Sequence, residues 1–143
     1  MSTWAWCANM MEYEHRVRIY HKDTDVLGIV HHSNYLVFFE QARSEVLRSL
    51  GIELPLLLES QGIQFAVAAL EIKYSKPARL DDMLVIFSKV TKLDKCSVFF
   101  KQQAFKEPNL MQPICVAQVR LAVIDYHTKL AAIPLALQEE LMR

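Results

Sequence analysis

The stretch H-K-D-T-D-V-L-G-I-V-H-H-S-N-Y, residues 21–35, is the segment around which the rest of the chain is organised, because it joins an alternating segment to the longest apolar helical segment of the chain. It contains two aspartates, three histidines and one of only three glycines. Titratable side chains placed directly before a core helix are typical of a catalytic or binding site, where environment tunes their chemistry. We therefore predict the functional site in this stretch.

The residues before this stretch are predicted to form a half-buried strand. Val17 and Ile19 lie on one face of an alternating pattern, with polar side chains on the other face. If the extended conformation continues, the same face carries His21, Asp23 and Asp25. The inward side of the strand would then end in titratable groups.

The residues after the stretch are predicted to form a helix over residues 35–50. Its first two turns are apolar on most sides, which is typical of a helix enclosed by other structure. Ser33 or Asn34 is expected to be the N-cap, and Gly51 the C-terminal stop. This helix is the candidate centre of the core.

The remainder of the chain is predicted to be mostly strand. Short turns between consecutive strands make them antiparallel, and an enclosed helix needs a sheet that curls around it. We expect an α+β fold in which one sheet of about five strands wraps one long helix. The expected elements are a helical turn within 53–60, strands at 64–75, 83–93, 95–105 and 114–125, and a short helix within 134–143.

Composition narrows the class of protein. The chain of 143 residues has the size of one domain, which we place at residues 12–143 after an extension of residues 1–11. Sixteen basic residues balance sixteen acidic ones, so we expect no nucleic-acid partner. No apolar run predicts a transmembrane helix. Three cysteines without CxxC spacing indicate free thiols and a cytoplasmic location.

Two motifs carry a resemblance to a known family. The segments D-T-D-V-L-G-I-V-H-H-S-N-Y (23–35) and F-F-E-Q-A-R-S-E-V-L-R (38–48) resemble the hotdog-fold acyl-CoA thioesterases, above all the YbgC branch related to 4-hydroxybenzoyl-CoA thioesterase. K-P-A-R-L-D-D (76–82) extends the resemblance. It implies a hotdog fold, hydrolysis of acyl-CoA without a metal or organic cofactor, and a homodimer or homotetramer with sites at the subunit boundary.

The resemblance also implies roles for single residues. Asp25 stands at the position of the family's catalytic carboxylate, and His32 at the position whose backbone N–H faces the thioester carbonyl. Such a hydrolase needs a base or nucleophile and an oxyanion donor, and an amide at a helix start supplies a fixed positive dipole. Further substrate contacts are expected at Gly28, Val30, His31, Tyr35 and Arg79, the last with coenzyme A phosphates.

Two alternatives from other classes remain. Asp23, Asp25, His31 and His32 could be the ligands of a metal-dependent hydrolase, although their spacing matches no recognised metal motif. The fold also serves binding roles, so a non-catalytic or acyl-carrier-protein-directed partner in cell-envelope or phospholipid organisation is the other alternative. Within the leading interpretation, Asp23 and His31 are favoured as structural residues.

Overall fold

The computed structural model describes residues 12–142, and the predicted extension at residues 1–11 lies outside this part of the chain. None of the helices in the described part is long and apolar enough to span a bilayer. The elements, in chain order, are β1 (Glu12–Arg18), the 3-10 turn η1 (His21–Asp23), α1 (Asn34–Ser49), α2 (Leu54–Gln61), β2 (Ile63–Tyr74), β3 (Met83–Asp94), β4 (Ser97–Lys106), β5 (Cys115–Asp125) and α3 (Leu135–Leu141).

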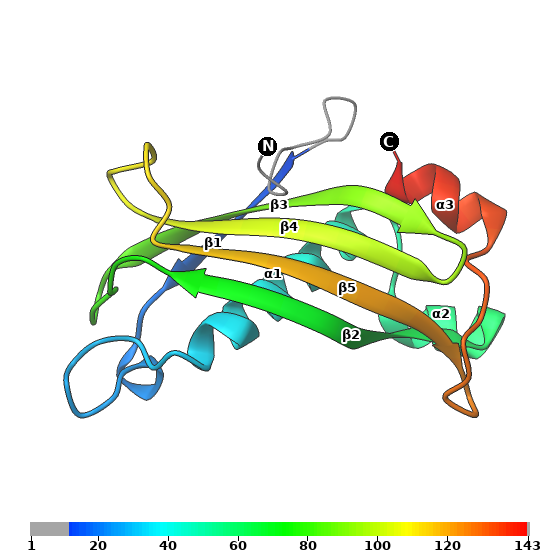
Figure 1. Ribbon diagram of the computed structural model, residues 1–143, viewed down its shortest axis with the longest axis horizontal. Coiled ribbons are helices and arrows are strands. Elements are labelled where there is room, and N and C mark those ends of the chain that lie inside the picture. Colours follow the sequence, from blue (N-terminus) through cyan, green and yellow to red (C-terminus); the bar gives the residue numbers. More distant parts are fainter. Residues whose placement is uncertain (1–11, 143) are drawn as a thin grey trace.

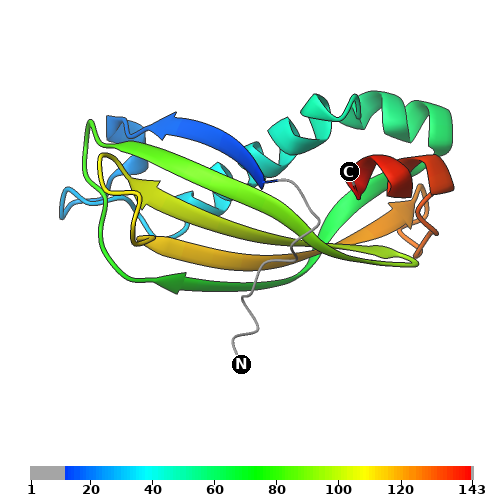
Figure 2. The same ribbon diagram turned by 90° about the horizontal axis from the view of Figure 1, so that it is seen from above.

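The five strands of the described chain form one sheet in the order β1-β3-β4-β5-β2, with every neighbouring pair antiparallel. Strand β2 therefore lies at one edge, opposite β1, although it directly precedes β3 in the chain. The sheet curves around α1, which lies across one of its faces (Figures 1 and 2). The predicted α+β architecture, a curled antiparallel sheet around one long helix, is confirmed.

Helix α1 packs on the sheet through one stripe rather than through its whole circumference. The stripe repeats at intervals of three and four residues, as expected for one helix face. Leu36 and Val37, in the first turns, are 37% and 44% exposed. The prediction of a helix enclosed on most sides is therefore wrong here, because the sheet of one chain covers only one side. The buried side chains of α1 include Tyr35, Phe38, Phe39, Ala42, Val46 and Leu47.

A buried polar network fixes α1 on the sheet. Gln102 of β4 donates from Nε2 to the Phe39 carbonyl and to Ser88 Oγ, both at 2.9 Å. Its Oε1 accepts a hydrogen bond from Arg43 Nη1 at 3.0 Å. Burial lowers the pKa of the Arg43 guanidinium, and the charge of Glu40 opposes that shift. Because every partner in the network is satisfied, the polar groups define one register of helix against sheet.

The predicted continuation of the first strand into the site is wrong. Strand β1 ends at Arg18, and the chain then turns through η1. The turn forms because the Asp23 carboxylate accepts the backbone N–H of Tyr20 at 2.9 Å, and the Asp23 N–H donates to the Tyr20 carbonyl at 3.0 Å. The Asp23 side chain therefore takes the Tyr20 N–H, a donor that a continued strand would use in its hydrogen bonds to the neighbouring strand. The titratable groups consequently lie in loops beyond the strand.

Candidate active site

The residues from Asp25 to Ile29 form a tight turn that holds the Asp25 carboxylate. The Asp25 N–H donates to the Ile29 carbonyl at 2.9 Å, and the Gly28 N–H donates to the Asp25 carbonyl at 3.0 Å. The Leu27 N–H donates to Asp25 Oδ1 at 2.8 Å. Gly28 has φ +78°, a left-handed conformation that favours glycine. The turn orients the carboxylate, and Oδ2 has no partner among residues 12–142.

This turn is attached to the connection between β2 and β3. The Val30 N–H donates to the Ala78 carbonyl at 2.9 Å, and Ile29 forms an isolated antiparallel bridge with Arg79. Two segments about fifty residues apart in the chain thus share backbone hydrogen bonds, an arrangement that fixes one against the other. The K-P-A-R motif (76–79) therefore lies beside the motif of residues 23–35.

Asp23 joins the end of β1 to the start of α1. Its side chain is 2% exposed and accepts hydrogen bonds from the Tyr20 N–H at 2.9 Å, from Asn34 Nδ2 at 2.6 Å and from Lys22 Nζ at 3.2 Å. Its carbonyl accepts the His31 N–H at 3.0 Å. A buried carboxylate with this many donors is engaged by the fold itself. Its geometry agrees with the structural role favoured from the sequence.

Helix α1 begins without a side-chain cap. Ser33 occupies the N-cap position, but its side chain makes no capping hydrogen bond. Its Oγ lies instead 2.7 Å from His31 Nδ1, which also accepts the Ser33 N–H at 3.3 Å. The helix start is held from outside by the contact between Asp23 and Asn34. The Asn34 and Leu36 N–H groups in the first turn donate to the His31 and Ser33 carbonyls at 2.9 and 3.1 Å.

The backbone amide of His32 lies two residues before the start of α1. Within residues 12–142 no acceptor takes its N–H. On either side of it the backbone is fixed, because the His31 carbonyl accepts the Asn34 N–H at 2.9 Å and the His32 carbonyl accepts the Tyr74 hydroxyl at 2.9 Å. The ring of His32 stacks on His31, with centroids 4.4 Å apart. The result is a held, unpaired N–H two residues before the start of a helix.

Asp25 and His32 line one hollow of about 320 Å³. Tyr35 and Tyr74 form an aromatic wall, with ring centroids 5.5 Å apart at an interplanar angle of 68°. Burial raises the pKa of Tyr35 to about 12, so its hydroxyl is protonated at neutral pH. The hollow is thus apolar along one wall and polar where the motifs meet. Its lining consists of Asp25, Ile29, Val30, His32, Tyr35, Tyr74, Ser75, Lys76 and Pro77.

The structure brings together four of the seven site residues expected from the sequence. Gly28, His31 and Arg79 do not line the hollow. Gly28 shapes the turn, His31 points to Ser33, and Arg79 lines a neighbouring hollow. Sequence reasoning missed Tyr74, Ser75 and Pro77. The position of β2 in the sheet brings Tyr74 to His32, and the hydrogen bond between Val30 and Ala78 brings the following residues to the same hollow. No local pattern in the sequence reports either contact.

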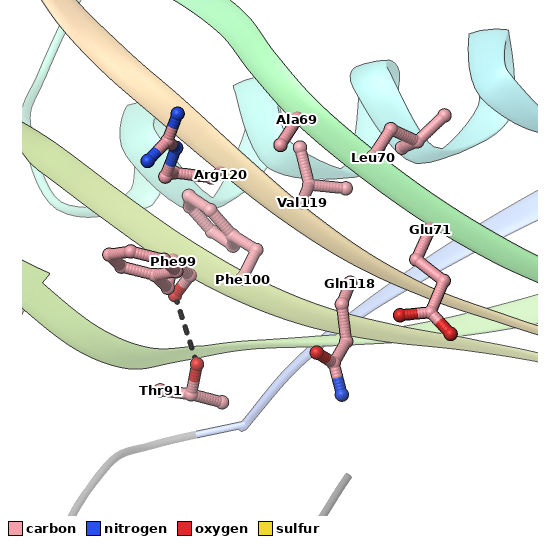
Figure 3. Close-up of a pocket in the computed structure, with 9 residues that line it drawn as sticks. All are labelled: Ala69, Leu70, Glu71, Thr91, Phe99, Phe100, Gln118, Val119 and Arg120. Carbon is pink, nitrogen blue, oxygen red and sulfur yellow. Dashed lines mark hydrogen bonds between the residues drawn. The ribbon is translucent and has the colours of Figure 1, made fainter. Parts of the chain in front are cut away.

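A larger hollow of about 440 Å³ lies on the sheet face turned away from α1 (Figure 3). Gln118 and Arg120 lie there because they alternate with the core residue Val119 along β5. Thr91 Oγ1 donates to the Phe99 carbonyl at 3.3 Å within it. No residue of the 21–35 stretch lines this hollow. The predicted chemistry therefore concerns the smaller hollow around Asp25.

The metal alternative gains no support from this geometry. Within residues 12–142 no three His, Cys, Asp or Glu side chains are grouped as the ligands of a metal ion would be. The Asp23 carboxylate and His31 Nδ1 are engaged with Tyr20, Asn34 and Ser33. The four side chains proposed as ligands do not converge.

Comparison with known proteins agrees with the fold and the motifs. The Thioesterase superfamily profile matches residues 27–111. Over 109 residues the chain is 38% identical to the acyl-CoA thioesterase YbgC of Haemophilus influenzae, covering 76% of this chain and 78% of that protein. The acyl-CoA thioester hydrolase YbgC of Escherichia coli O157:H7 is 35% identical over the same length, with 76% and 79% covered. A probable thioesterase from Bartonella henselae superposes with a TM-score of 0.81 at 32% identity, covering 87% of this chain and all of that one.

The curled sheet around α1 is the hotdog fold, and the class of protein that fold and relatives define is a thioester hydrolase. The chain belongs to the Thioesterase superfamily, and the YbgC proteins are among its relatives. The family resemblance read from residues 23–35, 38–48 and 76–82 is confirmed.

Proposed function

We propose that the protein hydrolyses acyl-CoA thioesters, taking up water and releasing a carboxylic acid and free coenzyme A. Asp25 acts as general base or nucleophile, and the His32 N–H donates to the oxyanion. Acyl-CoA thioesterase activity in the YbgC relatives supports this substrate class. Val30 and Tyr35 contact the acyl part of the substrate, Gly28 and His31 shape the loop around it, and Arg79 meets the coenzyme.

One observation carries the proposal. Asp25 and His32 line the same hollow, and each keeps one polar group without a partner among the described residues, Oδ2 of Asp25 and the N–H of His32. Thioester hydrolysis requires this pair, an acceptor or nucleophile at the carbonyl carbon and a donor at the developing oxyanion. Since the His32 amide lies just before α1, the helix dipole adds positive potential at the oxygen.

The test is release of free thiol from acyl-CoAs of graded chain length. Purified protein is expected to turn over at least part of the series with saturable kinetics and no added metal. The optimal length reports the depth of the hollow beyond Tyr35 and Tyr74. Failure to release thiol from any aliphatic or aromatic acyl-CoA, by protein that shows a cooperative thermal transition, would contradict the proposed function.

We further propose that the protein is a homodimer or homotetramer with its sites at a subunit boundary. Strand β2 pairs only with β5 in the described chain, so its outer edge is unpaired. Val67 and Leu70 on β2 are 55% and 39% exposed. An unpaired edge strand with exposed apolar side chains is a surface that proteins normally cover. The β2 edge of a second copy of the chain would pair with the free backbone groups and cover the exposed apolar side chains.

The assembly is tested by light scattering at micromolar concentration, where a mass of two or four chains is expected. Val67→Lys is expected to shift the mass toward one chain and to lower turnover, because it places a charge at the edge of β2. Leu135→Lys, at a side chain of α3 that is 70% exposed, is the matched control and is expected to keep both mass and turnover. A fully active monomer would exclude sites that need a subunit boundary.

We also propose a cellular location for the protein, an alternative carrier of the acyl group and the boundaries of the domain. Cys96 and Cys115 are free in the described chain, which is compatible with a reducing compartment, and we assign the protein to the cytoplasm. We place the thioesterase domain at residues 12–143. An acyl carrier protein is the alternative donor of the acyl group, and a non-catalytic role in cell-envelope or phospholipid organisation is the alternative function.

A further inference from the structure

The Tyr74 hydroxyl links the sheet to the loop that precedes α1. Tyr74 is the last residue of β2, and its strand ends at the same end of the sheet as the start of α1 (Figure 1). Its hydroxyl donates to the His32 carbonyl at 2.9 Å. No backbone N–H among residues 12–142 donates to that carbonyl. The sheet therefore holds the loop at His32 through a side-chain hydroxyl.

The tyrosine that carries this hydroxyl is itself held in place. Its backbone pairs with Cys115 of β5, a residue that is fully buried. Its ring meets the ring of Tyr35 at 5.5 Å between centroids and the ring of His32 at 6.5 Å, with interplanar angles of 68° and 86°. Edge-to-face contacts of this kind are favourable and directional. Tyr74 is consequently a firm attachment point for the loop.

The Tyr74 hydroxyl carries its proton at neutral pH. Its pKa is raised above the ordinary value of about 10, first by partial burial and then by the neighbouring Cys115. A phenolate would have no proton to donate and would repel the carbonyl oxygen of His32. The raised pKa therefore keeps Tyr74 in the form that holds the loop.

The hydrogen bond restrains the residue that supplies the unpaired N–H. The N–H and the carbonyl of His32 are separated only by the two soft backbone dihedrals of that residue, so fixing the carbonyl limits rotation about both. On the other side, the His31 carbonyl accepts the Asn34 N–H at 2.9 Å. An oxyanion donor stabilises the transition state when it already points to where the charge develops. The Tyr74 contact provides that arrangement from the sheet side.

We propose that Tyr74 is a positioning residue for thioester hydrolysis, whose hydroxyl holds the His32 backbone so that the His32 N–H meets the developing oxyanion. This inference rests on the proposed function, because it concerns the donor used at the same site. Tyr74 acts through His32 and not on the reacting atoms. A phenylalanine ring would fill the same wall of the hollow without holding the loop.

Tyr74→Phe is expected to lower kcat for acyl-CoA hydrolysis about 10- to 30-fold with KM little changed, because a modest displacement of a reacting group has an effect of this order. Tyr126→Phe is the matched control. The Tyr126 hydroxyl donates to the Leu58 carbonyl at 2.9 Å, and Tyr126 follows β5 at the end of the sheet opposite to Tyr74. It lies outside the hollow and is expected to keep kcat and KM within about twofold.

Thermal unfolding separates positioning from simple support of the fold. Each variant loses one hydroxyl-to-carbonyl hydrogen bond of 2.9 Å, so both are expected to lower the midpoint by similar small amounts. Only Tyr74→Phe is expected to lose kcat. Wild-type kcat in Tyr74→Phe would overturn the inference and leave the proposed function standing. A loss confined to KM would also overturn it, because Tyr74 would then act on substrate binding.

Two unreactive analogues of acyl-CoA report the donor without turnover. A trifluoromethyl ketone is hydrated in water and presents a tetrahedral carbon with oxygens, whereas a thioether of the same chain has no such oxygen. Wild type is expected to bind the ketone about 100-fold more tightly, as transition-state analogues are bound. Tyr74→Phe is expected to lose most of this ratio, and Tyr126→Phe to keep it. The same loss in a protein that hydrolyses no thioester would overturn the proposed function and keep the link between Tyr74 and the His32 donor.

Discussion

Asp25→Asn is expected to lower kcat for acyl-CoA hydrolysis by about a thousandfold, within the range that a positioned acid–base group contributes. An amide can neither accept the proton of water nor attack the thioester carbonyl. The variant keeps the oxygen that accepts the Leu27 N–H at 2.8 Å, so the turn from Asp25 to Ile29 is retained. KM is expected to change little, because the carboxylate acts on the transition state rather than on binding.

The measurement is thiol release under saturating substrate, with thermal unfolding as the check on the fold. Asp81→Asn is the matched control. Asp81 is exposed, lies outside the hollow and has φ +69°, a conformation that asparagine tolerates as well as aspartate does. The control is expected to keep kcat within about twofold. Near-normal turnover by Asp25→Asn would show that another group performs the chemistry.

Local periodicity was sufficient to predict most elements of the fold. The interval of two residues in the strands and of three to four residues in α1 reflects which side chains face the core, and this information is present in any short window. The predicted helix over residues 35–50 is observed at Asn34–Ser49. The order of strands in the sheet is not local information, and the position of β2 at the edge required the tertiary structure.

In the candidate site, too, some residues could be predicted from local sequence and others only from the tertiary structure. Asp25 and His32 lie within one motif, so the sequence alone could single them out. Tyr74 donates to the carbonyl of His32 from 42 residues further along the chain, and it could not be recognised before β2 was placed. The prediction that β1 continues to Asp25 is wrong for a different reason. The Asp23 side chain captures the Tyr20 N–H, and such side-chain bonds are invisible to a pattern of polar and apolar residues.

Asp23→Ala is expected to lower the free energy of unfolding by about 3 kcal/mol, because it leaves the half-buried Tyr20 N–H and Asn34 amide without their acceptor. The carboxylate is 2% exposed and accepts from Tyr20, Asn34 and Lys22. Asp94→Ala is the matched control, because Asp94 is exposed and its partner Lys92 is a surface residue. A surface pair contributes about 0–1 kcal/mol, so chemical denaturation should separate the two variants clearly.

The same variant is expected to lose about a hundredfold in kcat at a temperature where circular dichroism shows it folded, because a small displacement of a reacting group costs that much. The Asp23 carboxylate holds the Asn34 side chain, two residues after the unpaired His32 amide. The His31 N–H donates to the Asp23 backbone carbonyl, which the variant keeps. Losing the Asn34 contact loosens the oxyanion donor on its helix side without touching Asp25. The loss should therefore lie in kcat with KM little changed, and Asp23→Asn, which retains one acceptor, should recover part of it. A folded Asp23→Ala with normal kcat would show that Asp23 supports the fold alone and that the His32 amide is positioned by the Tyr74 contact.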